Sequence, residues 1–252
     1  MGFFTEELLV CAARVEVGPL GQSFWAVLER STGELHEQTR LRIPGRRGEV
    51  WTEGGRLGGD RDRAVTRIRS RGVVASLRCA AEPWVEVACA SGPQAYTWTR
   101  KRSGAIECEL RLGDRLISAS GRGIEDESAG YHPRHTEWRW SAGAGLTLDG
   151  REIAWNLVSG INDPPRNSER AIWVDGEPTE PGPVSFDGLD GVDFAEGSRL
   201  SFGVEAERRR DENMLVIRSS YRQPFGSFTG SLPGGIELER GLGVMEHHEA
   251  TW

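Results

Sequence analysis

A segment in the middle of the chain, GYHPRHTEWRW, places acid–base residues next to aromatic ones. Successive side chains of a β-strand point to opposite faces. In an extended conformation Arg134, Trp138 and Trp140 therefore share one face, and His135 and Glu137 share the other. If one face lines a cavity, the indoles give it an apolar wall, and the titratable groups lie at its rim or against a neighbouring element.

These residues suit acid catalysis on an apolar molecule. A carboxyl group in an apolar cavity keeps its proton to a higher pH, because burial disfavours the charged form. Glu137 is the first candidate acid, Glu169 is the second, and His135 could orient the acid or relay its proton. Arg134 and Asn156 could anchor a polar part of the ligand. The alternative is structural, since buried Arg and Glu side chains often simply pair with each other.

The two tryptophans of the segment also have two interpretations. Desolvated indole faces stabilise a developing positive charge by about 2 kcal/mol, which would help a reaction that passes through a cation. Trp138 and Trp140 are then ligand contacts. Alternatively they are large core residues, because tryptophan is highly buried on average.

Two close histidine pairs, His132/His135 and His247/His248, raise the question of metal binding. Residues one or three positions apart on a regular strand lie on opposite faces, so neither pair can chelate an ion without a bend or bulge. The cysteines form no cluster. We therefore expect no metal. The serine-hydrolase elbow, the phosphate loop and the dinucleotide fingerprint are also absent, and we expect no cofactor.

Composition argues against several other classes of function. Asp and Glu total 38 against 31 for Lys and Arg, and the net charge of -7 argues against a nucleic-acid partner. Lys101 is the single lysine, so Schiff-base chemistry has one possible carrier, to which we give little weight. The longest apolar run near the start, Leu8 to Ala13, is far shorter than the roughly 20 residues of a membrane-spanning helix.

The four cysteines, Cys11, Cys79, Cys89 and Cys108, show no C-x-x-C spacing, and no basic, apolar leader precedes them. This pattern predicts a cytoplasmic protein with free thiols. It leaves the oligomeric state open.

Turn signals and alternation predict an all-β fold. Asp-Gly dipeptides at 149–150, 175–176 and 187–188 lie between short runs that alternate apolar and polar residues, as in successive hairpins. Helical periodicity is limited to one short helix at most, over Thr5 to Val15. Many short strands without intervening helices favour a sandwich or barrel over a parallel α/β sheet. The alternating runs are Ile106 to Ser118, Thr136 to Leu146, Glu152 to Val158, Ala171 to Val174 and Met214 to Ser220.

The length of the chain fits either one large barrel or two barrel-like halves in tandem. Polar, Gly- and Arg-rich stretches at Pro44 to Arg63 and Gly121 to Ser128 are the candidate long connections. The second one suggests a boundary near residue 125, with an N-terminal half over 1–125 and a C-terminal, lipocalin-like half over 126–252. The C-terminal run Gly243 to Trp252 ends in tryptophan and is expected to close a barrel edge rather than to trail as a tail.

Several motifs resemble those of a bacterial family of domains of unknown function, family 2804. They are Thr97 to Lys101, Tyr131 to Trp140, Asp149-Gly150, Asn156 to Val158, Asn162-Asp163, Glu169, Trp173 to Gly176, Gln223 to Gly230 and Gly243 to Trp252. The resemblance covers the chain from about residue 95 to its end. Arg170 departs from it, since it stands where the family pattern usually has Asn.

The family is distantly similar to carotenoid hydratases of the hydroxyneurosporene synthase type and to lipocalin-like cyclases. This similarity implies a lipocalin-like (calycin) barrel around a ligand cavity, but a shared fold does not transmit a shared reaction. The leading hypothesis is a cofactor-independent hydratase, isomerase or cyclase acting on a hydrophobic, isoprenoid or polyketide-like small molecule. Gln223 joins Arg134, Asn156 and the two tryptophans as a candidate ligand contact.

Two alternatives belong to other classes of protein. The same cavity could sequester a lipid or a pigment without catalysis, as lipocalin-like barrels do. Nine tryptophans could instead fill the interior, giving a scaffold or interaction protein.

Overall fold

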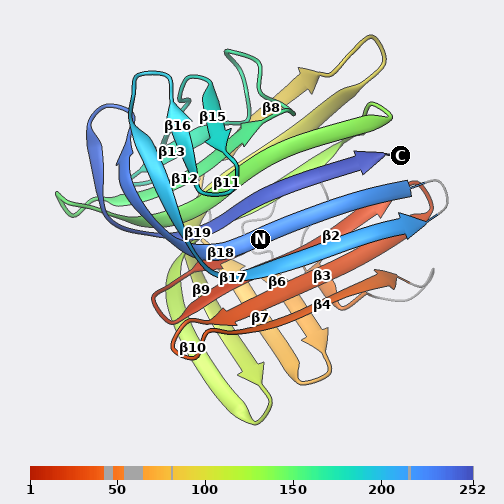
Figure 1. Cartoon of the computed structure of the whole chain (residues 1–252). Helices are drawn as coiled ribbons and strands as arrows, with labels where there is room; N and C mark the ends of the chain where they lie inside the picture. Colours follow the sequence, from red (N-terminus) through yellow and green to blue (C-terminus); the bar gives the residue numbers. More distant parts are fainter. Residues whose placement is uncertain (43–47, 54–64, 81, 215–216, 252) are drawn as a thin grey trace.

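The computed structural model describes residues 1–42, 48–53, 65–80, 82–214 and 217–251, and in these residues the chain is all-β (Figure 1). The prediction of an all-β fold is confirmed. The short helix expected over Thr5 to Val15 is wrong, because most of that stretch forms strand β2 (Leu8–Val17), which pairs with β1 and β3. Within the described residues, no helix has the length and apolar character needed to cross a membrane.

The N-terminal sheet is antiparallel and has the strand order β4-β3-β2-β1-β10-β9-β7-β6-β5, with β8 added beside β9. Its further strands are β1 (Gly2–Phe4), β3 (Leu20–Glu29), β4 (Glu34–Arg42), β5 (Val50–Glu53), β6 (Val65–Ser70), β7 (Val73–Cys79), β8 (Val85–Ala90), β9 (Tyr96–Leu112) and β10 (Arg115–Tyr131).

The C-terminal sheet is also antiparallel, in the order β14-β13-β12-β11-β19-β18-β17-β16-β15. Its strands are β11 (His135–Thr147), β12 (Glu152–Ser159), β13 (Ala171–Val174), β14 (Glu177–Thr179), β15 (Val184–Asp187), β16 (Gly191–Phe194), β17 (Arg199–Met214), β18 (Ile217–Leu232) and β19 (Ile236–Thr251).

Each sheet curls around a core of its own. In the N-terminal sheet, Trp25 and Val27 of β3 share one buried cluster with Val50 of β5, although β3 and β5 lie near opposite ends of the strand order. In the C-terminal sheet, Trp155 of β12 shares a second cluster with Phe194 of β16. Residues from both ends of each sheet therefore meet inside it, which is the geometry of a nearly closed barrel.

A third buried cluster joins the two sheets. Leu9 and Leu28 of the N-terminal sheet pack with Trp173, Phe225 and Val244 of the C-terminal sheet. Phe225 and Val244 lie on β18 and β19, which are internal strands of the C-terminal sheet. Each of these strands is paired with a neighbour on both sides, so the backbone that carries the interface residues is fixed.

The change from one sheet to the other falls at residues 132–134, between β10 and β11. The predicted boundary near residue 125 lies inside β10, and the predicted connection Gly121 to Ser128 is wrong because it is part of that strand. Of the other predicted connection, Pro44 to Arg63, residues 48–53 are described and include β5, while the remainder lies outside the described residues.

Strand β19 explains the character of the C-terminal run. It is ordered, as predicted, but it does not close an edge, since it pairs with β11 on one side and with β18 on the other. Trp252 itself lies outside the described residues. The C-terminal strand is thus the centre of its sheet, and removing it would separate the two halves of that sheet.

Candidate functional site between the two sheets

Three successive cross-strand ion pairs mark the part of the β9/β10 hairpin nearest the C-terminal sheet. They are Arg100–Glu127, Lys101–Asp126 and Arg102–Glu125. Because side chains alternate along a strand, the central pair points to the opposite face from the two arginine pairs. The arginine pairs pack against Trp84. The centroid of its ring lies 4.2 Å from Arg100 Cζ and 4.4 Å from Arg102 Cζ. The lysine pair instead faces the C-terminal sheet.

Lys101 connects the two sheets. Its Nζ lies 2.5 Å from Asp126 Oδ2 and 3.4 Å from Glu169 Oε1. Glu169 belongs to the loop between β12 and β13 of the C-terminal sheet. Asn162, from the same loop, donates from Nδ2 to Glu169 Oε2 at 2.8 Å. Burial opposes the ammonium charge, but Asp126 and Glu169 outweigh it and raise the pKa of Lys101. Lys101 is therefore held as a cation and is no Schiff-base nucleophile.

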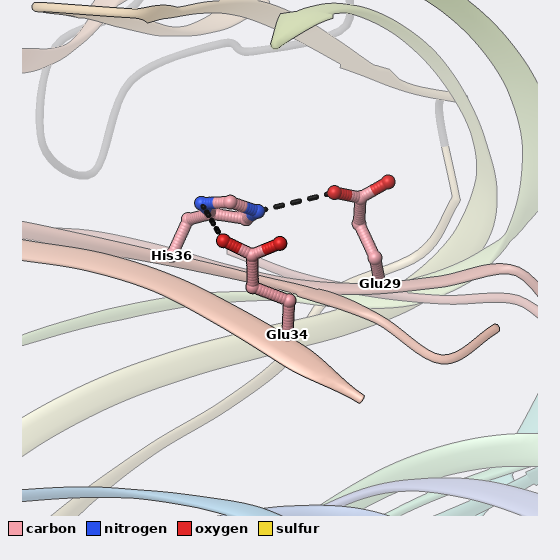
Figure 2. A group of neighbouring side chains, drawn as sticks. All are labelled: Glu29, Glu34 and His36. Carbon is pink, nitrogen blue, oxygen red and sulfur yellow. Dashed lines mark hydrogen bonds and ion pairs between the residues drawn. The ribbon is translucent and has the colours of Figure 1, made fainter. Parts of the chain in front are cut away.

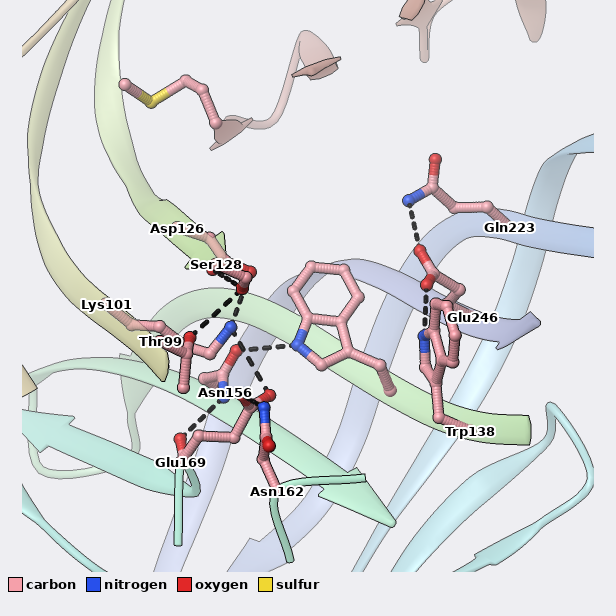
Figure 3. Close-up of polar contacts among 12 residues, drawn as sticks. Thr99, Lys101, Asp126, Ser128, Trp138, Asn156, Asn162, Glu169, Gln223 and Glu246 are labelled. Atoms are coloured by element: carbon pink, nitrogen blue, oxygen red, sulfur yellow. Dashed lines mark hydrogen bonds and ion pairs between the residues drawn. The ribbon is translucent and has the colours of Figure 1, made fainter. Parts of the chain in front are cut away.

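Burial also dominates at Glu169. It raises the pKa of this carboxyl, although the charge of Lys101 and the hydrogen bond from Asn162 act in the other direction. The loop that carries Glu169 is fixed to the sheet by Asn156, which donates from Nδ2 to the Glu169 carbonyl at 2.9 Å. Trp140 in turn donates from Nε1 to Asn156 Oδ1 at 2.7 Å. We call Lys101, Asp126, Asn156, Asn162 and Glu169 the lysine group (Figure 3).

Arg170 supports the same loop. Its Nη1 donates to the carbonyl of Asp163 at 3.1 Å, and its Nη2 donates to the carbonyl of Pro164 at 2.7 Å. The side chain is buried, so these bonds hold the loop from the inside.

A second polar group surrounds Glu246 of β19. Trp138 Nε1 donates to Glu246 Oε1 at 2.8 Å, and Tyr221 donates its hydroxyl proton to Oε2 at 2.8 Å. Gln223 Nε2 also donates to Oε2, at 3.3 Å. We call Trp138, Tyr221, Gln223 and Glu246 the acid group; Figure 3 shows Gln223, Glu246 and Trp138 together, apart from the lysine group.

The acid group can hold a proton. Burial raises the pKa of Glu246, against the hydrogen bonds of Tyr221 and Trp138 and the charge of Arg208. Among the described residues, no Lys, Arg or His forms an ion pair with Glu246 at salt-bridge distance. A carboxylate offers about four acceptor positions, and the three donors leave one on Oε1. Glu246 also keeps partial contact with solvent, as do Trp138 and Trp140.

Strand register aligns these residues in a row. Arg208 of β17 lies directly opposite Gln223 of β18, and Trp140 of β11 lies directly opposite Glu246 of β19. The Gln223–Glu246 hydrogen bond completes the row. Opposed residues of neighbouring strands project from the same face, about 5 Å apart. Trp140 therefore lies between the two groups, beside Glu246 in the row and bonded to Asn156.

His248 of β19 lies next to the acid group, directly opposite Trp138 on one neighbouring strand and Tyr221 on the other. Its ring centroid is 4.3 Å from that of Trp138 and 5.2 Å from that of Tyr221, and its Nε2 is 2.8 Å from Ser219 Oγ. Burial lowers the pKa of His248 to about 4, helped by the charge of His247 and Arg208. The imidazole is thus neutral near pH 7 and packs as a polar aromatic ring.

The predicted acid Glu137 lies elsewhere. It is exposed, and His247 Nε2 lies 3.0 Å from its Oε1, with Arg139 at 3.6 Å. The hydrogen bond with His247 lowers the pKa of Glu137, so the expectation of a buried carboxyl with a raised pKa is wrong. The predicted alternation of side chains is correct, but Glu137 and His135 lie on the outward face of β11. Arg134 precedes β11 and is exposed.

The other predicted residues come together between the sheets. Trp138 and Gln223 belong to the acid group, while Asn156, Glu169 and the indole of Trp140 belong to or contact the lysine group. Sequence reasoning missed Asp126, Asn162, Tyr221 and Glu246, and it gave Lys101 little weight. A signal for Lys101 was present, because it is the only lysine among the 31 basic residues.

One cluster of the described residues has side chains close enough to share a metal ion: Glu29, Glu34 and His36, with ligand atoms within 4.8 Å of one another (Figure 2). His36 Nε2 lies 3.1 Å from Glu29, and its Nδ1 lies 3.7 Å from Glu34. Arg115 donates to Glu29 at 2.7 Å. Because Arg115 already supplies a cation and both ring nitrogens face carboxylates, the cluster suits an ion-pair network better than a metal site.

A hollow of about 720 Å³ lies beside this cluster and is lined in part by Trp25, His36 and Arg115. It opens broadly to the surface, so it is a groove of the N-terminal sheet rather than an enclosed barrel cavity.

Comparison with known proteins defines the class and then the family. The architecture is that of a lipocalin-like all-β protein. Kievitone hydratase from Nectria haematococca superimposes with a TM-score of 0.62 at 15% identity, over 95% of this chain and 83% of that one. A candidate AttH of Nitrosomonas europaea superimposes with a TM-score of 0.52 at 14% identity, over 95% and 86%.

The chain belongs to the family of domains of unknown function DUF2804, which it matches over residues 64–252. The match begins before residue 95, where the resemblance was expected to start. A comparison with curated proteins gives no match. At these identities the solved structures establish the fold, and the chemistry is argued from the site.

Proposed function

We propose that this protein is an enzyme that transfers a proton from Glu246 to a carbon–carbon double bond of a hydrophobic small molecule. The observation that carries the proposal is the environment of Glu246. It is a carboxyl with a raised pKa, held by neutral donors alone, with one acceptor position of Oε1 free. A carboxyl with a raised pKa is suited to general acid catalysis, because it keeps its proton to a higher pH than an exposed carboxyl does.

The proposed reaction is hydration. The Oε1–H bond of Glu246 breaks and its proton forms a C–H bond at one alkene carbon, which leaves a cation at the other. The indole faces of Trp138 and Trp140 stabilise that cation, by about 2 kcal/mol when desolvated. Water adds its oxygen to the cation and loses one proton, so the product is an alcohol. Glu246 is reprotonated from solvent, and the net change is the addition of one water.

The lysine group supports the second half of this reaction. Asp126 is 31% exposed, in contrast to Lys101 at 3%, so its carboxylate can reach a water molecule while Lys101 fixes its position. We assign to Asp126 the role of accepting the proton that the attacking water loses. Glu169 forms an ion pair with Lys101 and so helps to position the ammonium group.

Cyclisation is the second outcome of the same acid step. If the ligand folds a second double bond against the cation and excludes water, a carbon–carbon bond forms in place of the C–O bond. The cation that this leaves on the second double bond then loses a proton to Asp126, so the product is an isomer of the substrate. The lipocalin-like fold, which the chain shares with a protein named as a hydratase, is compatible with either outcome. The four cysteines are unpaired and buried, which supports the proposed location in the reducing cytoplasm.

Isotope labelling tests the proposal across a panel of candidate substrates. The purified protein is incubated in ¹⁸O-water with prenylated phenols, polyenes and enones, and products are analysed by mass spectrometry. Hydration predicts a product that has gained one labelled water, and cyclisation predicts a product of unchanged mass and altered retention. Both must disappear with Glu246→Gln. Ligands that bind and come back unchanged would instead support a carrier.

A further inference from the structure

Two buried polar atoms beside the acid have no partner within the described part of the chain. They are Gln223 Oε1, an acceptor, and Arg208 Nη1, a donor. The residues are 3% and 2% exposed. Burying such an atom without a partner is unfavourable, so buried polar atoms nearly always have partners. A bound ligand can supply both partners at this site.

Neighbouring contacts fix the direction of both atoms. Arg208 Nη2 donates to Thr39 Oγ1 at 2.7 Å, and Nε lies 3.0 Å from Glu37 Oε2. The guanidinium also lies 4.2 Å from the ring of Phe24 and 4.8 Å from that of Tyr221. Thr39 and Glu37 thus engage two of its nitrogens, and two aromatic rings pack against the guanidinium, so turning Nη1 toward another protein partner would break these contacts.

Gln223 is oriented by the acid itself. Its Nε2 donates to Glu246, so the amide plane directs Oε1 away from that carboxyl. Because Gln223 and Arg208 are directly opposed in the β17/β18 register, the free acceptor and the free donor leave the same face of the sheet. One ligand can therefore meet both atoms while it contacts Glu246.

We propose that the substrate is an oxygenated hydrophobic molecule, with a hydroxyl group that donates to Gln223 Oε1 and a carbonyl or oxyanion that accepts from Arg208 Nη1. The inference rests on the proposed function and narrows its substrate class. It places oxygen substituents close to the double bond that Glu246 protonates. It excludes a pure isoprenoid hydrocarbon, which would leave both buried atoms unpaired.

Four matched probes test this inference by binding alone: stilbene, para-hydroxystilbene, chalcone and para-hydroxychalcone. They share two aromatic rings and a double bond, and they differ in the hydroxyl and the carbonyl. Dissociation constants are measured by quenching of tryptophan fluorescence. Each polar group should tighten binding roughly three- to tenfold, as expected for one net hydrogen bond, so para-hydroxychalcone binds tightest and stilbene weakest.

Variants assign the two contributions. Gln223→Met keeps the length of the side chain and should remove the gain from the hydroxyl while it retains the gain from the carbonyl. Arg208→Met should do the reverse, and Arg208→Lys replaces it if the methionine variant fails to fold. Melting temperatures verify that each variant is native.

Equal affinity for all four probes, binding of none, or an unchanged ranking in the variants would overturn the inference. The outcome is separable from that of the proposed function. A retained ranking without any labelled product would leave the recognition of oxygen substituents standing and remove the enzyme.

Discussion

Glu169 and Glu246 both lie between the two sheets, and burial raises the pKa of both, yet their partners differ. Glu169 faces Lys101 and the amide of Asn162. Glu246 faces an indole, a phenol and an amide, none of which carries charge. The lysine group thus places one ammonium between two carboxyl groups, whereas the acid group holds a single carboxyl among neutral donors.

The comparison separates two uses of a buried carboxyl. A carboxylate beside an ammonium is stabilised in its charged form, and breaking such a pair by removing one partner is strongly destabilising. A carboxyl among neutral donors can lose or gain a proton without leaving a charged partner behind. We therefore expect substitutions in the lysine group to act mainly on stability and substitutions in the acid group to act mainly on turnover.

The largest effect is expected from Glu246→Gln. The amide keeps the shape of the side chain and cannot supply a proton, so turnover should fall by about 100- to 10,000-fold while ligand affinity changes little. The measurement is kcat and Kd for any substrate found by isotope labelling. Glu137→Gln is the matched control on the outward face of the sheet. Equal losses in the two variants would remove Glu246 as the acid.

Lys101→Met should come next, with a loss of about 3–5 kcal/mol in the free energy of unfolding, because Asp126 and Glu169 would face each other without a cation. Urea unfolding followed by circular dichroism gives the value. Adding Glu169→Gln should restore part of the loss, since it removes one of the two unpaired carboxylates. A Lys101→Met protein as stable as the wild type would contradict the role of Lys101 as the cation between these two carboxyl groups.

A smaller effect should appear as the pH is lowered. Burial lowers the pKa of His248 from 6.5 to about 4, so between these values the unfolded chain takes up a proton that the folded chain refuses. Stability is therefore fully present above pH 6.5 and is lost as the pH falls toward 4, by on the order of 1–3 kcal/mol from this group. Unfolding curves of wild type and His248→Gln should diverge across this window, and parallel curves would disprove the assignment.

The smallest effect is expected at Glu137. Its side chain is 44% exposed and its ion pair with His247 is therefore screened by water. Glu137→Gln should change the free energy of unfolding by less than about 1 kcal/mol, as is usual for surface pairs, and should leave turnover unchanged. A large loss of turnover in a folded Glu137→Gln protein would restore the acid first predicted from the sequence.

Much of the fold followed from local sequence patterns. The Asp175-Gly176 pair, for instance, has φ values of 51° and 87°, which is the backbone of a tight hairpin turn. The prediction of a connection at Gly121 to Ser128 was wrong for a physical reason. Its glycines give it the composition of a loop, but a Cβ at Gly123 would lie 2.0 Å from the Gly2 carbonyl oxygen, so glycine permits the close approach of β1 to β10.

The site was only partly predictable, because alternation gives two faces but not which of them is covered. The pattern of β11 separates Glu137 from Trp138 correctly, and packing of the N-terminal sheet then buries the tryptophan face. Glu246 has no local signal, since it is one of several acidic residues in a polar strand. Its role depends on Tyr221 and Trp138. These residues are far from Glu246 in the sequence, and the pairing of the strands brings them next to it.

The most direct test of the account is the titration of Glu246 itself. Carbon-detected NMR of protein labelled at the glutamate carboxyls, with Glu246→Gln and Glu137→Gln used for assignment, follows both groups in one sample. Burial raises the pKa of Glu246 and the His247 hydrogen bond lowers that of Glu137, so Glu246 should release its proton at the higher pH. A Glu246 resonance that titrates together with Glu137, or below it, would contradict the proposal that Glu246 is the acid.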